Sequence, residues 1–264
     1  MNRKPLNHKN YGHIAHLPGS RMGPGDHKCH EGQMKIACEK TRDKHDRVII
    51  QEKLDGSNVG VCLVNNTILP ITRAGYLADT SPFEMHHIFN NWAHENEKRF
   101  RAILAEGERL CGEWLLVAHG TKYNLPHEPF VAFDLMVKKH DRAPFDKFSL
   151  LAAKGDFITP YIIHDGEPLS VETALSQLGE YGHHGALEQV EGAVWRIERN
   201  ELINKHLGNI GGRAPIVDFL VKYVRPNKED GKYLVKNGVG ETVYNKTPNK
   251  SFNRNCSEKP SQSA

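Results

Sequence analysis

Three β-prone segments follow one another between residues 47 and 73. Residues 47–53 contain a β-branched run and end just before Asp55-Gly56, a dipeptide typical of tight turns between strands. Residues 58–64 read as a second strand, and two asparagines then turn the chain into a third strand over 67–73. Strands joined by such short turns run antiparallel. The sequence therefore predicts an antiparallel meander.

Ser81-Pro82-Phe83-Glu84 has the pattern of a helix start: a capping serine, a proline at the first helical position and a glutamate three residues after the serine. Apolar residues then recur at i, i+3, i+4 and i+7, as expected for a core-facing stripe, at Met85, Ile88, Phe89 and Trp92. The pattern further predicts helices over 100–104 and 170–181 and strands over 110–117, 130–137, 192–197 and 219–224. Because strands and helices do not alternate regularly, the sequence favours an α+β fold of mostly antiparallel sheets flanked by helices.

Composition excludes several classes of protein. The chain is 38% apolar and 25% charged, which is typical of a globular domain. Its longest apolar runs are far shorter than the roughly 20 residues that span a bilayer, and the N-terminus shows no secretory signal pattern. Five scattered cysteines fit free thiols in a reducing compartment, so we expect a cytoplasmic protein. A zinc site is possible from His27, Cys29, His30 and Cys38, but the spacing lacks paired metal-binding clips and favours surface histidines.

Charge divides the chain into three parts. Residues 1–53 and residues 222–264 each carry a net charge of +5, whereas the stretch between them carries −7. A basic rim around an acidic centre suits a protein that holds a polyanion and coordinates metal ions, although charged ends that only keep the chain soluble give the same pattern. We expect an irregular, basic, His- and Gly-rich arm over 1–45, a folded domain over 46–226, and a basic, partly disordered extension over 227–264.

The most informative segment is Glu52-Lys53-Leu54-Asp55-Gly56-Ser57-Asn58. A lysine at the end of a strand is held on a rigid element where the chain opens. Such an amine becomes a nucleophile when its pKa falls through burial or through a neighbouring cation. Taken alone, K-x-D-G is a weak signal, and an exposed turn lysine explains it equally well.

The order of the features downstream strengthens the signal. After the Lys53 segment come Arg73, Gly112-Glu113-Trp114, Phe130-Val131-Ala132-Phe133-Asp134, Glu191-Gly192-Ala193-Val194 and Lys222-Tyr223. This order resembles the successive motifs of the covalent nucleotidyltransferases, which include DNA ligases, RNA ligases and mRNA capping enzymes. The resemblance covers about residues 46–226 and implies an ATP-grasp-like ligase adenylation domain. Ser57-Asn58 and the surroundings of Phe133 are similar to the corresponding residues of the phage-type RNA ligases. DNA ligases and capping enzymes, in contrast, typically have arginine where this chain has Asn58.

The resemblance implies an ATP-dependent RNA ligase that joins 5′-phosphate and 3′-hydroxyl RNA ends through a lysyl-AMP intermediate, with ATP and a divalent metal (Mg²⁺ or Mn²⁺) and with no membrane or obligate protein partner. Lys53 would attack the α-phosphate, and Lys222 would stabilise the charge that develops there. Glu191 and Glu113 would bind metal, and Phe133 would stack on adenine. The remaining nucleotide-binding candidates are Glu52, Asp55, Asn58, Arg73 and Glu113. His119 and Tyr123 lie between two motifs and are weaker candidates.

The sequence departs from the family pattern near Lys222. The usual late motif has two lysines separated by one residue, but here the neighbouring positions are Leu220 and Val224. Arg225, Lys205 and Arg213 are the alternatives for the second cation. Three other functions stay open: a DNA ligase, a GTP-dependent capping-type enzyme, and a catalytically silent nucleic-acid-binding relative. The natural RNA substrate, the preferred metal and the oligomeric state have no signature in the sequence.

Overall fold

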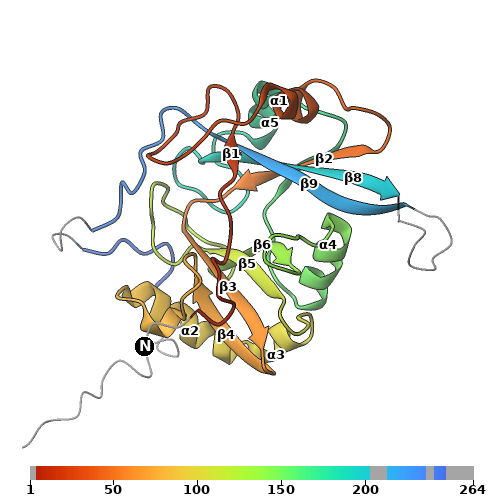
Figure 1. Cartoon of the computed structure of the whole chain (residues 1–264). Helices are drawn as coiled ribbons and strands as arrows, with labels where there is room; N and C mark the ends of the chain where they lie inside the picture. Colours follow the sequence, from red (N-terminus) through yellow and green to blue (C-terminus); the bar gives the residue numbers. More distant parts are fainter. Residues whose placement is uncertain (1–3, 203–212, 236–240, 248–264) are drawn as a thin grey trace, which may run out of the picture.

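A computed structural model describes residues 4–202, 213–235 and 241–247. Two sheets lie one above the other (Figure 1). The upper sheet has the strand order β1-β9-β8-β2-β7 and the lower sheet the order β4-β3-β5-β6. All strand pairs are antiparallel except β1 with β9. The strands of the upper sheet are β1 (Ala15–His16), β2 (Asp46–Lys53), β7 (Ile162–Gly166), β8 (Gly192–Leu202) and β9 (Arg213–Val224). The expected α+β class is confirmed.

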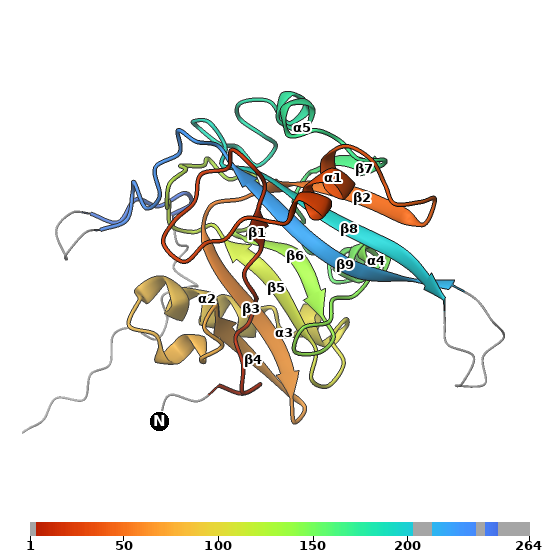
Figure 2. The ribbon, with the colours of Figure 1, turned by 45° about the horizontal axis from the view of Figure 1, so that its top comes forward.

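The lower sheet and its helices enclose the larger core. Its strands are β3 (Ser57–Val64), β4 (Thr67–Thr72), β5 (Arg109–Trp114) and β6 (Phe130–Met136). Helices α2 (Glu84–Glu95), α3 (Glu97–Arg101) and α4 (Phe145–Lys154) pack on it, with a short 3-10 turn at Ala78–Thr80. The outer face of the upper sheet is covered by α1 (Glu31–Cys38) and α5 (Val171–Leu178) (Figure 2).

The turn at Asp55-Gly56 is not a hairpin, so the expected three-stranded meander is wrong at this point. β2 pairs with β7 and β8, whereas β3 pairs with β4 and β5, and the turn carries the chain from one sheet to the other. β2 is buried along most of its length because both of its faces are covered. Only the β3–β4 hairpin of the expected meander is confirmed.

Two details of α2 differ from the expectation. The helix begins at Glu84, three residues after Ser81, because Ser81 follows the 3-10 turn and its hydroxyl accepts a hydrogen bond from the Phe83 N–H (3.2 Å). Ile88, Phe89 and Trp92 are buried in the core as expected. Met85 is not, since it lines a cleft between the sheets.

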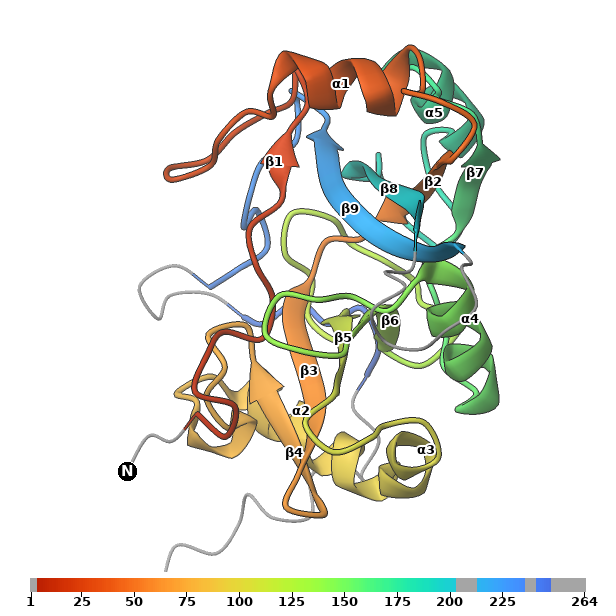
Figure 3. The same cartoon turned by 45° about the vertical axis from the view of Figure 1, so that its right-hand side comes forward.

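The segment expected to be an irregular arm contains β1 and α1 and packs against both sheets. It runs from β4 up to β9 and then into α1 (Figure 3). Tyr11 and Leu17 are buried, and the Asn10 N–H donates a hydrogen bond to the Arg73 carbonyl (3.1 Å). The sequence pattern missed β1 and α1, and also α4 and β7.

The described part of the C-terminal extension also packs on the domain. Lys228 donates hydrogen bonds to the carbonyls of Gly120 (3.1 Å) and Gln189 (2.7 Å). Asn245, which belongs to the extension expected to be partly disordered, is buried and bonded to the backbone of Leu115 and Tyr123. The rest of the expected disordered stretch, from 248 on, lies outside the described residues.

Candidate functional site

A polar cleft opens between the two sheets where β2 ends. It has a volume of about 700 Å³ and adjoins a smaller pocket of about 180 Å³, which we name the apolar pocket because Tyr11, Phe133 and Leu220 line it. Five residues line both spaces: Lys53, Asn58, Arg73, Glu113 and Lys222. Glu191 and Asp55 line the polar cleft. Residues that are up to 169 positions apart in the sequence, at the ends of different strands, therefore meet at one place.

Lys53 is the last residue of β2 and extends into this cleft. Its ammonium pairs with the Glu191 carboxylate, which precedes β8, the strand next to β2. Burial lowers the pKa of Lys53, but the negative charges of Glu191, Glu113 and Asp55 outweigh that effect and leave the pKa above its usual value. In the free protein Lys53 is therefore a charged, paired amine, and it must lose its proton before it can act as a nucleophile.

Glu113 lies beneath the Asp55-Gly56 turn. β5 pairs with β3 so that Glu113 is opposite Asn58, and the Glu113 carboxylate accepts a hydrogen bond from the Gly56 N–H (3.1 Å). Burial first, and then the neighbouring Glu191, raise the pKa of Glu113 to about 7 although Lys53 opposes the shift. Gly56 is required here, because a Cβ at this position would lie 2.6 Å from the Trp114 carbonyl oxygen.

Asp55 shapes one wall of the cleft. Its carboxylate accepts hydrogen bonds from the Gly120 N–H (3.0 Å) and the Thr121 hydroxyl (3.1 Å), and its own N–H donates to the Tyr123 hydroxyl (3.2 Å). His119 lines the cleft, where its Nε2 lies 3.2 Å from the Ser57 hydroxyl. Tyr123 is buried and supports Asp55 from behind instead of facing the cleft.

Two cations expected from the sequence, Lys222 and Arg73, line the cleft from different strands. Lys222 lies on β9, where burial and the charge of Lys53 lower its pKa, and its nearest carboxylate is Asp26 at 3.8 Å. Arg73 follows β4. Of the alternatives for the second cation, Arg225 donates to the Gly179 carbonyl (2.7 Å) and does not line the cleft. Arg213 is at the other end of β9 from Lys222, and Lys205 lies outside the described residues.

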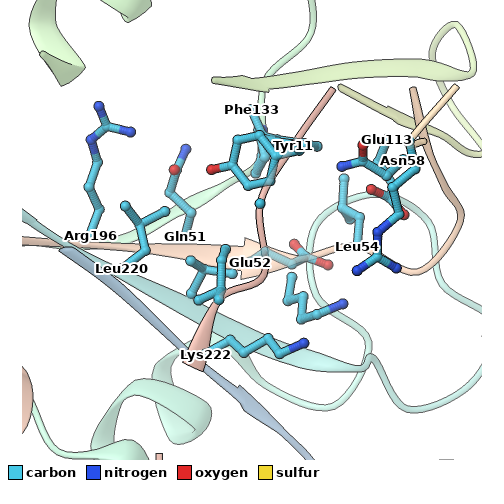
Figure 4. A pocket seen from close by; sticks show the side chains of 16 residues that line it. Tyr11, Gln51, Glu52, Leu54, Asn58, Glu113, Phe133, Arg196, Leu220 and Lys222 are labelled. Carbon is cyan, nitrogen blue, oxygen red and sulfur yellow. The ribbon is translucent and has the colours of Figure 1, made fainter. Parts of the chain in front are cut away.

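The apolar pocket has an aromatic side and an aliphatic side. In Figure 4, Phe133 and Tyr11 lie together on one side, and Leu220 and Lys222 lie on the other. The Tyr11 and Phe133 rings pack edge to face with centroids 5.1 Å apart. Tyr11 belongs to the segment expected to be an arm and was missed, because a single aromatic residue without periodicity gives no signal in the sequence.

Glu52 faces away from Lys53. Successive residues of a strand alternate between the two faces of the sheet, and the Glu52 carboxylate accepts a hydrogen bond from the His183 N–H (3.0 Å) behind β2. Burial raises the pKa of Glu52 to about 7. The residue contributes to the lining of the apolar pocket, but its carboxylate is engaged elsewhere.

A buried ionic network fixes the aromatic side of the apolar pocket. Asp134, next to Phe133 on β6, is fully buried and accepts a hydrogen bond from the Tyr11 hydroxyl (2.7 Å). It also pairs with Arg142 (2.9 Å) and Arg196 (3.1 Å), which connects β6 to β8 of the upper sheet. The sequence pattern showed Asp134 only as a neighbour of Phe133 and gave no indication of these partners.

The two carboxylates suit a divalent cation only together with a phosphate ligand. Among residues 4–202, 213–235 and 241–247, no group of three His, Cys, Asp or Glu side chains is arranged to hold a metal. The charge of Glu191 raises the pKa of Glu113, and the charge of Lys53 lowers the pKa of both carboxylates. When Lys53 becomes neutral, Glu113 and Glu191 lack a positive charge that a bound divalent metal would supply.

Comparison with solved structures finds ligases of low sequence identity. An archaeal ATP-dependent RNA ligase is 20% identical, with a TM-score of 0.41, over 69% of this chain and 44% of its own. A lysine variant of an RNA ligase from Naegleria gruberi, with AMP and Mn, is 14% identical with a TM-score of 0.48, over 83% of this chain and 58% of its own. A putative ATP-dependent DNA ligase from Aquifex aeolicus is 16% identical, with a TM-score of 0.45, over 81% of this chain and 49% of its own.

The chain thus spans about half the length of these solved ligases. No curated protein matches it. In the part of the chain that the structure describes, no helix is both long enough and apolar enough to cross a bilayer. The family model described as RNA ligase matches residues 46–245, which is most of the chain and includes every residue of the cleft from Lys53 to Lys222. The chain therefore belongs to the RNA ligase family.

Proposed function

We propose that the protein is an ATP-dependent RNA ligase that joins a 5′-phosphate to a 3′-hydroxyl through AMP bound covalently to Lys53. This proposal rests on the residues that surround Lys53. The Lys53 amine lies at a strand end, pairs with Glu191, and lines a cleft together with Arg73 and Lys222. This cleft adjoins a pocket with an aromatic wall. A lysine with a purely structural role would not require this carboxylate, these cations and these aromatic residues around it.

The lining residues of the pocket and cleft support one orientation of ATP. Its adenine would enter the apolar pocket against Phe133, while its ribose lies near Glu113 and Asn58. Its α-phosphate would then lie between Lys53 and Lys222, which line both the pocket and the cleft. Lys222 would stabilise the negative charge that gathers on the phosphate oxygens during the attack.

A divalent metal, held by Glu191 and Glu113 together with the phosphates, would neutralise charge on the triphosphate. Engagement of Glu191 with such a metal would also leave Lys53 without its carboxylate partner. Glu191 raises the pKa of Lys53 in the free protein. Once Glu191 is engaged elsewhere, Lys53 loses that support, and the nearby Lys222 favours its neutral form.

The AMP would next be transferred to an RNA 5′-phosphate, and a 3′-hydroxyl would displace it. Asn58, which accepts a hydrogen bond from the Asn10 amide (3.1 Å), stands where DNA ligases and capping enzymes typically have arginine. Family membership supports RNA as the polynucleotide.

Incubation with ATP or GTP labelled at the α-phosphate, with Mg²⁺ or Mn²⁺, followed by a denaturing gel, tests the proposal. We expect ATP to label the wild-type protein and not the Lys53→Ala variant. Lys154→Ala, an exposed lysine at the end of α4, is the matched control and should label normally. Labelling by GTP alone would indicate a capping-type enzyme, and no labelling of the wild type would indicate a silent relative.

Labelled Lys53→Ala would disprove the assignment of the nucleophile. A second assay compares sealing of nicks in RNA and DNA strands that carry 5′-phosphate and 3′-hydroxyl ends. Preference for the DNA strand would replace the RNA ligase by a DNA ligase.

A further inference from the structure

The segment before residue 46 lies outside the part matched by the family model, yet it forms part of the candidate site. Ile14 lines the apolar pocket, and His16 and Arg21 line the polar cleft. This segment follows the end of β9: the Leu17 N–H donates to the Lys222 carbonyl (2.8 Å) and the Arg21 N–H to the Val224 carbonyl (2.9 Å). Arg21 is therefore held beside the last residue of β9.

The side chains of β9 form a series from the pocket into the cleft. Leu220 lines the apolar pocket, Lys222 lines both spaces, and Val224 lines only the polar cleft. Alternate residues of a strand share a face and lie roughly 6.5 Å apart. A nucleotide with its base against Leu220 and its α-phosphate at Lys222 would extend its remaining phosphates toward Val224. The backbone of Arg21 is hydrogen-bonded to Val224.

Arg21 is half-buried, and within the described parts of the chain no ion pair or hydrogen bond engages its guanidinium. The two lysines of the cleft differ in this respect, whereas the Arg73 guanidinium, which also lines the cleft, likewise has no ion pair or hydrogen bond among the described residues. Lys53 pairs with Glu191, and Lys222 is 3.8 Å from Asp26. A guanidinium presents five N–H donors in a planar fork that matches phosphate oxygens, so Arg21 and Arg73 have the most unused capacity for a phosphate. Of the two, Arg21 is the one held beside Val224.

We infer that Arg21 binds the β- and γ-phosphates of ATP and orients the pyrophosphate as it leaves. This inference rests on the proposed function. In the adenylation step, the lone pair of neutral Lys53 forms the N–P bond, and the bond from the α-phosphorus to the bridging oxygen breaks. Its electron pair leaves on pyrophosphate, and the lysine proton passes to solvent. A cation near Val224 stabilises the charge that develops on the departing oxygen.

The RNA 5′-phosphate is the competing ligand for Arg21. ATP carries phosphates beyond the α position and AMP does not, so the two nucleotides separate the alternatives. Sealing of RNA that already carries AMP on its 5′-phosphate provides a second separation, because that step involves no pyrophosphate.

The experiment measures ATP and AMP binding by calorimetry with Mg²⁺, in a Lys53→Ala background that prevents turnover. Arg21→Ala should weaken ATP binding by roughly ten- to a hundredfold, the value of a charge-assisted contact, and change AMP binding less than about twofold. The Arg21→Lys variant should bind ATP with an affinity between those of Arg21→Ala and of the protein that keeps Arg21. Arg101→Ala, which removes an exposed arginine paired with Glu97 on α3, is the matched control and should leave both affinities unchanged.

With Lys53 restored, Arg21→Ala should slow adenylation by ATP and seal pre-adenylated RNA at the wild-type rate. Loss of sealing on pre-adenylated RNA, or equal weakening of ATP and AMP binding, would overturn the inference and assign Arg21 to the RNA or to the fold. Failure of labelled ATP to adenylate the wild-type protein would instead refute the proposed function. The two failures are therefore distinguishable.

Discussion

Asp134 offers the sharpest test of how the fold supports the apolar pocket. Its carboxylate is fully buried and is shared by the Tyr11 hydroxyl, Arg142 and Arg196. Asp134→Asn keeps the shape of the side chain and removes its charge. Two guanidinium groups then lose a common anion in a place from which water is largely excluded.

The structure determines how large the loss should be. Breaking a buried pair by removing one partner costs about 3–5 kcal/mol because the remaining charge is uncompensated. Arg196 keeps a second carboxylate, Glu198, at 2.7 Å, so most of the cost falls on Arg142. We therefore expect the lower limit, about 3 kcal/mol in the free energy of unfolding, which corresponds to a fall in Tm of roughly 6–12 °C for a domain of this size.

Urea and thermal unfolding of Asp134→Asn measure this loss. The matched control is Asp141→Asn, because Asp141 pairs with Lys138 at 3.7 Å and both side chains are more than half exposed. Such a surface pair contributes about 0–1 kcal/mol. If the two variants lose the same stability within 1 kcal/mol, the network around Asp134 does not stabilise the fold as argued. Tyr11 also packs on Phe133, so Asp134→Asn should weaken ATP binding as well.

Two further predictions concern the turn after Lys53 and the carboxylate beneath it. Gly56→Ala should reduce stability by about 1–3 kcal/mol and impair adenylation, because its Cβ would meet the Trp114 carbonyl at 2.6 Å; wild-type stability of the variant would contradict the close approach. Glu113 has a pKa raised to about 7, so its contribution to stability is present at low pH and is lost as the pH rises from about 4.5 through 7. Glu113→Gln removes that loss. In urea unfolding, the free energy of unfolding of Glu113→Gln should exceed that of the wild type by more at pH 8 than at pH 5. The same difference in free energy at both pH values would refute the raised pKa.

Local sequence patterns determined the first three strands of the central domain well. The strands at Asp46–Lys53, Ser57–Val64 and Thr67–Thr72 agree with their expected ranges within one residue. Lys53 was expected at a strand end, and it is the last residue of β2. These features depend on β-branched composition, alternation and turn residues within a few positions of one another, which a single sequence contains in full.

Only the tertiary structure decided which elements are neighbours. The Asp55-Gly56 turn has the composition of a hairpin, but β2 and β3 enter different sheets, because a turn dipeptide does not specify the partner of a strand. β1 is only two residues long, so it has no period to detect, and it pairs with a strand about 200 positions later. That pairing brings Tyr11 and Arg21 to the candidate site. The convergence of Lys53, Glu113, Glu191 and Lys222 likewise depends on contacts between residues far apart in the chain, and local patterns do not encode such contacts.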